Sequence, residues 1–419
     1  MGNYDRFEPA WVSHAVLWQV YPLGFTGADP TGADRAPAGG FAQLTGWLDY
    51  AVRLGASGLL LGPIFESSSH GYDTLDYFRI DSRLGTEQDF DDFVAAAHGR
   101  GLRIVLDGVF NHAGRQSRLL TEHPDWFRRA GDDFAVFEGH RHLVAFDHSR
   151  PEVARFVTEV LRHWLDRGAD GWRLDAAYAV APSFWTGVLP TIREQFPDVY
   201  LVGEVIHGDY AGFVADSGAD SVTQYEVWKA VWSSLNDGNF FELAWALRRH
   251  NDLLSRFVPQ TFVGNHDVTR IASKLRDERL LPLALVLLFT LAGTPSVYYG
   301  DEQAFRGVKE DRAGGDDAIR PAFPPTESHL HGAATFRLHQ QLIGLRRRHP
   351  WLHTARTEIV GLTNDVLQFE QRHGDERLRV ALNISPDPLD VDPDGLTPLL
   401  DGGLLDGRQL PPYGWAVFG

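Results

Sequence analysis

The sequence predicts an α/β fold with eight parallel strands, the (β/α)8 or TIM barrel, on the evidence of two observations. Short apolar runs alternate with helix-like segments over most of the 419 residues. Several of these runs are apolar without alternation, as strands are when helices cover both faces of a parallel sheet. Eight such units over roughly 250 residues or more are the number that this barrel requires.

The predicted elements follow one another in strand and helix order. The eight strands are Ala15–Val20, Gly58–Leu61, Arg103–Asp107, Gly171–Leu174, Val199–Val202, Ser221–Gln224, Gln260–Val263 and Ser296–Tyr299. The helices between and after them include Thr86–Gly99, Pro151–Arg167, Ser183–Phe196, Phe240–Leu254, Leu280–Leu291 and Thr335–His349. Acidic first-turn residues after Thr86 and the first-turn proline Pro151 are typical helix starts.

Two segments break the alternation and define the expected domains. Between strand 3 and helix 3 a loop-like excursion is rich in His, Arg and Asp, and after Trp351 short runs alternate with Gly, Pro and Asp turns. The second pattern predicts a small C-terminal antiparallel β domain. We therefore expect a barrel domain over 1–111 and 151–350, a short domain B over 112–150 and a β domain over 351–419.

Composition narrows the class of ligand. The formal net charge is −17, which argues against nucleic acid or an anionic membrane as partner. The chain has no cysteine, so disulfides and thiol chemistry are excluded. The first residues lack a secretory pattern, and the most apolar stretch, Leu280–Ala292, is too short to span a membrane. A cytoplasmic protein is expected.

Four carboxylates follow or end predicted strands: Asp107, Asp175, Glu204 and Asp267. Reactive residues of a (β/α)8 barrel lie at the carboxyl ends of its strands. A single carboxylate there could equally be a helix cap or an ion-pair partner. Four at equivalent positions favour a shared site for acid/base and nucleophilic chemistry, as in the cleavage of a glycosidic bond.

The neighbours of two carboxylates suggest different roles. Arg173 lies two residues before Asp175, so both side chains point to one face of a strand, where a guanidinium keeps a carboxylate ionised. Glu204 has the apolar neighbours Val202 and Val205, and apolar surroundings favour a proton-donating carboxyl group. Polar residues beside Asp267 and after Asn111 would bind hydroxyl groups.

Six segments make the chain resemble the α-amylase superfamily, glycoside hydrolase family 13. They occur in the order of the barrel and cover all of it: His70-Gly-Tyr-Asp through Ile80-Asp81, Asp107-Gly-Val-Phe-Asn-His112, Gly171-Trp-Arg-Leu-Asp175, Gly203-Glu-Val205, Asn265-His-Asp267 and Gly293 through Glu302. Together with Tyr225-Glu-Val-Trp-Lys-Ala230, they look most like the cyclomaltodextrinase, neopullulanase and maltogenic amylase group.

The resemblance implies a role for each matched residue. Asp175 would be the nucleophile, Glu204 the acid/base, and Asp267 the residue that binds and distorts the sugar. Tyr72, His112, Arg173 and His266 would bind the substrate. Asp107 and His207 are further candidate substrate-binding residues. The mechanism would be retaining, through a covalent glycosyl-enzyme. A structural Ca²⁺ ion held by Asn111 and Asp147 is a further expectation, although no cofactor is required for the chemistry.

The substrates that this resemblance implies are short linear or cyclic malto-oligosaccharides with α-1,4 and, as a further expectation, α-1,6 bonds, such as a cyclic maltosyl-maltose. Two differences from the group bear on substrate and assembly. The group's extra N-terminal β domain is not expected, which leaves a homodimer open, and Ile206 stands where tryptophan is frequent. The alternatives are a transglycosylase or glucosyl isomerase, which share the same intermediate, and a non-catalytic binding homologue, which should have lost one of the three carboxylates.

Overall fold

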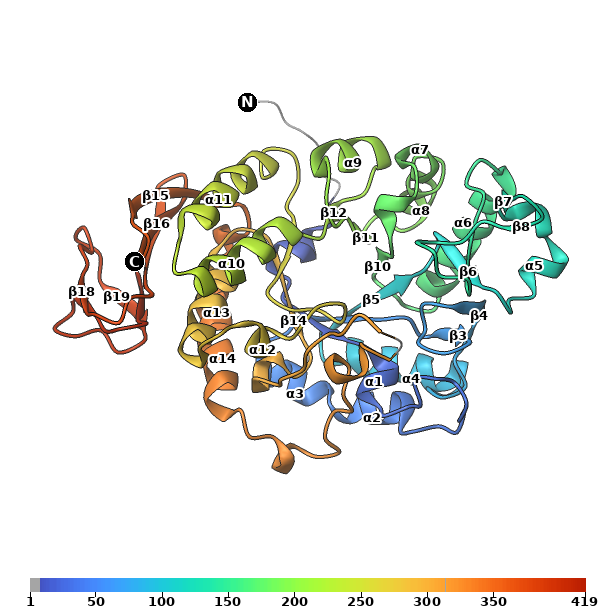
Figure 1. The fold of residues 1–419 in the computed structure, drawn as a ribbon, viewed down its shortest axis with the longest axis horizontal. Coiled ribbons are helices and arrows are strands. Elements are labelled where there is room, and N and C mark those ends of the chain that lie inside the picture. The colour runs from blue at the N-terminus through green and yellow to red at the C-terminus, as the bar shows by residue number, and fades with distance from the viewer. Residues whose placement is uncertain (1–7, 313) are drawn as a thin grey trace. The chain divides into compact units, whose positions relative to one another are not determined.

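The computed structural model describes residues 8–312 and 314–419 (Figure 1). Clustering of contacts along the chain defines two compact units. Unit 1 comprises the residues up to Val12, Leu17–Thr223 and Arg320–His329. Unit 2 comprises Ser13–Val16, Gln224–Ile319 and Leu330–Gly419.

Unit 1 contains six parallel strands in the order β12-β11-β10-β5-β2-β1. Their bounds are β1 Leu17–Val20, β2 Gly58–Leu61, β5 Arg103–Gly108, β10 Gly171–Leu174, β11 Tyr200–Gly203 and β12 Ser221–Val222. Every residue of β1, β2, β10 and β11 is buried. Burial on both faces explains why these strands are apolar without alternation.

The helices of unit 1 lie mainly between these strands along the chain. They are α1 Pro22–Phe25, α2 Gly40–Gly46, α3 Leu48–Leu54, α4 Glu87–His98, α5 Leu119–Glu122, α6 Pro151–Asp166, α7 Pro182–Trp185, α8 Leu189–Gln195 and α9 Tyr210–Ser217. A capping box formed by Thr86 and Asp89 begins α4. The single helix predicted over Ser183–Phe196 is wrong: it is two helices, because Pro190, which has no N–H to donate, can be placed only in the first turn of α8.

Two antiparallel features extend from the strands of unit 1. A hairpin of β3 Phe65–Ser67 and β4 Thr74–Ile80 precedes α4. Between β5 and α6, β6 His112–Gly114 pairs with β9 Leu143–Ala145, and β7 Arg129–Ala130 pairs with β8 Asp133–Phe134. These small sheets form the predicted excursion between strand 3 and helix 3.

Unit 2 contributes two further parallel strands, β13 Gln260–Phe262 and β14 Thr294–Tyr298, which pair with each other. Its helices are α10 Tyr225–Asp237, α11 Phe241–Leu253, α12 Ile271–Lys274, α13 Leu281–Thr290 and α14 Ala333–Arg348. Nine of the ten residues of α13 are buried, so the most apolar stretch of the sequence is a core helix. No helix within residues 8–312 and 314–419 is long and apolar enough to cross a membrane.

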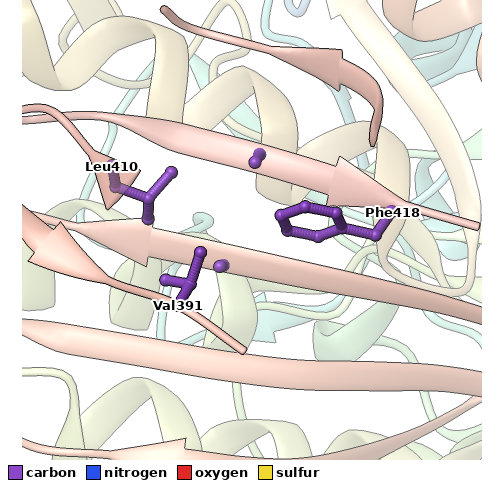
Figure 2. Close-up of a cluster of buried hydrophobic side chains, with 5 residues drawn as sticks. Val391, Leu410 and Phe418 are labelled. Atoms are coloured by element: carbon purple, nitrogen blue, oxygen red, sulfur yellow. The ribbon is translucent and has the colours of Figure 1, made fainter. Parts of the chain in front are cut away.

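The C-terminal part of unit 2 is an antiparallel sheet in the order β15-β16-β17-β21-β19. The strands are β15 Arg356–Leu362, β16 Val366–His373, β17 Glu376–Asn383, β19 Pro398–Asp401 and β21 Trp415–Phe418, with β18 Leu389–Asp390 paired to β20 Gln409–Leu410. Buried Val391, Leu410 and Phe418 belong to its hydrophobic core (Figure 2). The predicted C-terminal β domain is confirmed.

Eight parallel strands, six in unit 1 and two in unit 2, confirm the predicted (β/α)8 fold class. The predicted strand ends differ from the observed ones by up to two residues. The domain limits proposed from the sequence stay predictions.

Candidate active site

The central feature of unit 1 is a set of carboxylates at the carboxyl ends of three neighbouring strands. Asp107 lies near the end of β5, Asp175 directly follows β10, and Glu204 directly follows β11. Strand β10 lies between the other two, and Arg173 on it is in register with Asp107 on one side and Val202 on the other. The register therefore gathers these side chains at one edge of the sheet.

Arg173 joins all three carboxylates. Its Nη1 donates to both oxygens of Asp107, at 2.7 and 2.6 Å, and to Asp175 Oδ1 at 3.2 Å. Its Nη2 lies 2.7 Å from Glu204 Oε1. Burial lowers the pKa of Arg173, but the surrounding carboxylates outweigh burial and raise it well above its ordinary value. The guanidinium is thus a permanent cation on β10 that contacts carboxylates from the neighbouring strands β5 and β11.

The predicted contact between Arg173 and Asp175 is present, but it is the longest of these contacts. Glu204 also differs from the expectation of apolar surroundings, because Oε1 is paired with Arg173 and Oε2 accepts a hydrogen bond at 2.9 Å from the Ala176 N–H. The physical reason is that arginine on the middle strand is long enough to reach across to β11.

The turn after Asp175 donates two backbone hydrogen bonds to Glu204. Ala176 adopts a left-handed conformation, with φ of 44°, before the 3-10 helix Ala177–Ala179. This bend directs the Ala176 N–H to the Glu204 carboxylate and the Tyr178 N–H to the Glu204 carbonyl oxygen, at 3.2 Å. The turn after the predicted nucleophile therefore positions the predicted acid/base.

Tyr72 belongs to the same cluster. Its hydroxyl donates to Asp107 Oδ2 at 3.0 Å, and the guanidinium of Arg320 lies 5.8 Å from its ring centre. Asp107 therefore accepts from both Tyr72 and Arg173. These contacts indicate that Asp107 positions Tyr72 and Arg173, and its predicted substrate-binding role stays a prediction.

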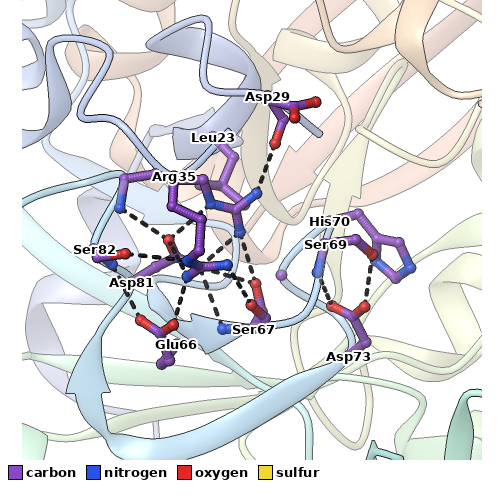
Figure 3. A network of polar contacts seen from close by, with 12 residues as sticks. Leu23, Asp29, Arg35, Glu66, Ser67, Ser69, His70, Asp73, Asp81 and Ser82 are labelled. Atoms are coloured by element: carbon purple, nitrogen blue, oxygen red, sulfur yellow. Dashed lines mark hydrogen bonds and ion pairs between the residues drawn. The ribbon is translucent and has the colours of Figure 1, made fainter. Parts of the chain in front are cut away.

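A buried polar network holds the segment that carries Tyr72 (Figure 3). Arg83 donates to Asp81 at 2.8 and 2.6 Å, and Asp81 accepts from the Ser67 hydroxyl at 3.0 Å. Ser69 donates through N–H and hydroxyl to Asp73, the residue after Tyr72, at 3.0 and 2.6 Å. Charged hydrogen bonds of this kind restrict the loop and hence the tyrosine ring.

His112 is buried and neutral. Burial lowers its pKa to about 4. Its Nε2 lies 3.0 Å from the Tyr72 carbonyl oxygen, so a neutral ring donates there, and its Nδ1 lies 3.1 Å from Asn111 Nδ2. Both ring nitrogens thus have protein partners, and one of them positions the backbone of Tyr72.

Two predicted site residues, His266 and Asp267, lie in unit 2. Five residues after β13, Asp267 has Oδ2 2.9 Å from Nε2 of buried His266, and its N–H donates to Asn265 Oδ1 at 2.9 Å. Asn265 in turn donates to the Tyr225 hydroxyl at 2.9 Å. These contacts place Asn265, His266 and Asp267 in one polar cluster, and the binding of sugar hydroxyl groups by this cluster stays a prediction.

Three residues near the unit 1 cluster were missed in the sequence. They are Tyr178, Glu138 and Arg320. The Tyr178 hydroxyl donates to Glu138 at 2.9 Å, and the Tyr178 ring lies 5.9 Å from the ring of exposed His207. Arg320 contacts Tyr72, as described above. The position of Tyr178, three residues after Asp175, was a usable signal. Glu138 and Arg320 carry no such signal, because folding alone brings them there.

The two residues expected to hold Ca²⁺, Asn111 and Asp147, both have protein partners in this structure. Asp147 Oδ1 accepts from the Ser149 hydroxyl at 2.6 Å, and Oδ2 lies 3.4 Å from Arg150. Asn111 turns its amide nitrogen to His112. Across the described part of the chain, no group of three His, Asp or Glu side chains is arranged to hold a metal ion. These contacts do not by themselves support the expected Ca²⁺ site, and calcium binding by Asn111 and Asp147 stays a prediction.

Comparison with known proteins identifies the family. The model of the alpha amylase catalytic domain matches residues 19–140 and 122–355. The chain belongs to the alpha-amylase family and is, by that membership, a glycoside hydrolase.

Similar relatives carry names of one group. A cyclomaltodextrinase from Bacillus sp is 28% identical over 91% of this chain and 75% of the relative. Neopullulanase 2 from Thermoactinomyces vulgaris is 31% identical over 81% of this chain and 64% of the relative.

Among solved structures, the chain is similar to cyclic alpha-maltosyl-(1→6)-maltose hydrolase from Arthrobacter globiformis in complex with that sugar, with a TM-score of 0.84 and 28% identity over 98% of this chain and 99% of the other. A debranching enzyme from Nostoc punctiforme has a TM-score of 0.81 and 26% identity, with the same coverage.

Proposed function

We propose that the chain is a retaining hydrolase of short malto-oligosaccharides, linear or cyclic, that cuts α-1,4 bonds, with α-1,6 bonds as a further expectation. The observation that carries the proposal is the single guanidinium of Arg173 in contact with Asp175 and Glu204. One guanidinium spans only a short distance, which suits the close carboxyl pair of retaining enzymes better than the wider pair of inverting ones. The names of the relatives and structural neighbours support the glucan class.

In the first step Asp175 attacks the anomeric carbon of the sugar and Glu204 gives its proton to the glycosidic oxygen, so the bond breaks and the leaving saccharide gains a hydroxyl. Nη1 of Arg173 lies 3.2 Å from Asp175 Oδ1, where its positive charge orients the attacking carboxylate. Both oxygens of Glu204 accept hydrogen bonds or pair in this structure, so one contact must give way when Glu204 carries the proton to substrate.

In the second step Glu204 takes a proton from water, the water oxygen attacks the anomeric carbon, and Asp175 leaves. Two displacements at one carbon retain its configuration. A sugar hydroxyl in place of water would give transfer, the alternative that shares this intermediate. Asp267, held by His266, is proposed to bind hydroxyl groups of the sugar.

The proposal extends to location and assembly. A similar relative is named intracellular maltogenic amylase, from Bacillus subtilis, which supports a cytoplasmic location. A homodimer stays a prediction, to be tested by light scattering of the purified protein.

Product analysis tests the function. Maltotriose, panose, pullulan, a cyclodextrin and a cyclic maltosyl-maltose would each be incubated with wild-type protein and with Asp175→Asn. The proposal is supported if the wild-type protein releases short products and Asp175→Asn does not. Equal activity in the two proteins would refute the assignment of Asp175, and products longer than the substrate would favour transglycosylation.

A further inference from the structure

The segment 136–142 at the end of the excursion contacts residues from three different strand-end loops of unit 1. The Phe137 ring stacks on His112 at 4.8 Å, and the His142 ring lies 5.9 Å from His70. At its other end, Glu138 accepts from the Tyr178 hydroxyl at 2.9 Å. The segment thus joins the neighbourhood of Tyr72 to the loop after Asp175.

Tyr178 is held beside the predicted acid/base. Its N–H donates to the Glu204 carbonyl oxygen at 3.2 Å, and its ring lies 5.9 Å from that of His207, three residues after Glu204. An acid that protonates the glycosidic oxygen must lie beside the leaving saccharide. Tyr178 and His207 therefore lie on the leaving-group side of the site.

Glu138 is an unusual residue for this place. It has a φ of 46°, in the left-handed region that residues other than glycine seldom adopt. The hydrogen bonds Phe137 N–H to Leu143 and His140 N–H to Phe137 close the turn around it. Backbone strain of this kind persists where surrounding contacts enforce it, and it is common at ligand clamps.

We propose that Glu138 and Tyr178 form a clasp that limits how much saccharide can extend beyond the cleaved bond, so that they determine specificity for short or compact glucans over long ones. This inference rests on the proposed function, because it places the leaving saccharide beside Glu204. The clasp closes the leaving-group side by joining segment 136–142 to the turn that carries Tyr178.

The test compares kcat/KM for maltotriose with that for long amylose. Tyr178→Phe removes only the hydroxyl, and Glu138→Ala removes its acceptor. Each is expected to raise the ratio of amylose to maltotriose about two- to tenfold, the factor that one net hydrogen bond corresponds to. The double variant should show no larger change than either single one, because both remove the same bond. Glu138→Gln, which keeps an acceptor oxygen, is the matched control and should stay near the wild-type ratio.

Hydrogen exchange of segment 136–142, measured without substrate, provides a second readout. Faster exchange in Tyr178→Phe than in wild type is expected. An unchanged ratio in variants that still cut maltotriose, or unchanged exchange, would overturn the clasp. A wild-type protein that cuts no glucan would instead refute the proposed function, and the exchange measurement would still decide whether the bond holds the segment.

Discussion

Nη2 of Arg173 lies 2.7 Å from Oε1 of Glu204, although the two residues are on different strands and 31 positions apart in the chain. The same guanidinium also reaches Asp107 and Asp175. A single buried cation therefore organises the carboxylates that the resemblance assigns to nucleophile and acid/base. Its loss should affect both catalysis and folding.

Arg173→Lys should lower kcat about 10²-fold or more, because a lysine ammonium is a point charge that cannot contact three carboxylates with a rigid fork. The free energy of unfolding should also fall, by about 3–5 kcal/mol if the buried carboxylates lose their partner. Steady-state kinetics and urea unfolding measure the two effects. A wild-type kcat in Arg173→Lys would show that catalysis does not need the planar guanidinium of Arg173.

Glu204→Gln should lose about 10²- to 10⁴-fold in kcat/KM on maltotriose, the usual contribution of a general acid. The loss should be much smaller on 4-nitrophenyl α-maltoside, whose leaving group departs without a proton. Asp175→Asn is the comparison, because loss of the nucleophile should abolish both reactions. Equal losses on the two substrates in Glu204→Gln would contradict its role as acid.

Asp81→Asn should weaken the network that holds the loop of Tyr72, since Arg83 would lose a charged acceptor and remain buried. We expect a loss of about 1.5–3 kcal/mol in stability together with a higher KM for maltotriose. Asp49→Asn, which breaks an exposed pair with Arg100, is the control and should leave both unchanged. A lower melting temperature with an unaltered KM would mean that the network stabilises the fold without positioning Tyr72.

His250 should make stability depend on pH. Burial lowers its pKa to about 4, while an unfolded histidine titrates near 6.5. The unfolded chain therefore binds a proton first as pH falls, so the stabilisation is complete above about 6.5 and is lost between 6.5 and 4. His250→Gln should reduce the slope of unfolding free energy in this range by up to about 1.4 kcal/mol per pH unit. A wild-type slope in His250→Gln would contradict the assignment.

The sequence predicts what depends on local pattern and strand ends. The bounds of the fully buried strands β2 and β10 are predicted correctly from their sequences. Arg173 and Asp175 are predicted to share a face because they are two positions apart. The pairing of Arg173 with Glu204 depends on the register between strands β10 and β11. That register cannot be predicted from one sequence alone. The bond between Glu138 and Tyr178 depends on the folding of a 39-residue excursion (112–150), and Pro190 divided a helix that apolar spacing alone predicted as continuous.

The retaining mechanism through Asp175 and Glu204 is tested most directly by the configuration of the first product. Proton NMR of maltotriose cleavage, recorded before the anomers of the new reducing end interconvert, separates α from β. A product that is α at first and then drifts toward the equilibrium mixture is predicted. A product that is β at first would show a single displacement and would contradict the mechanism.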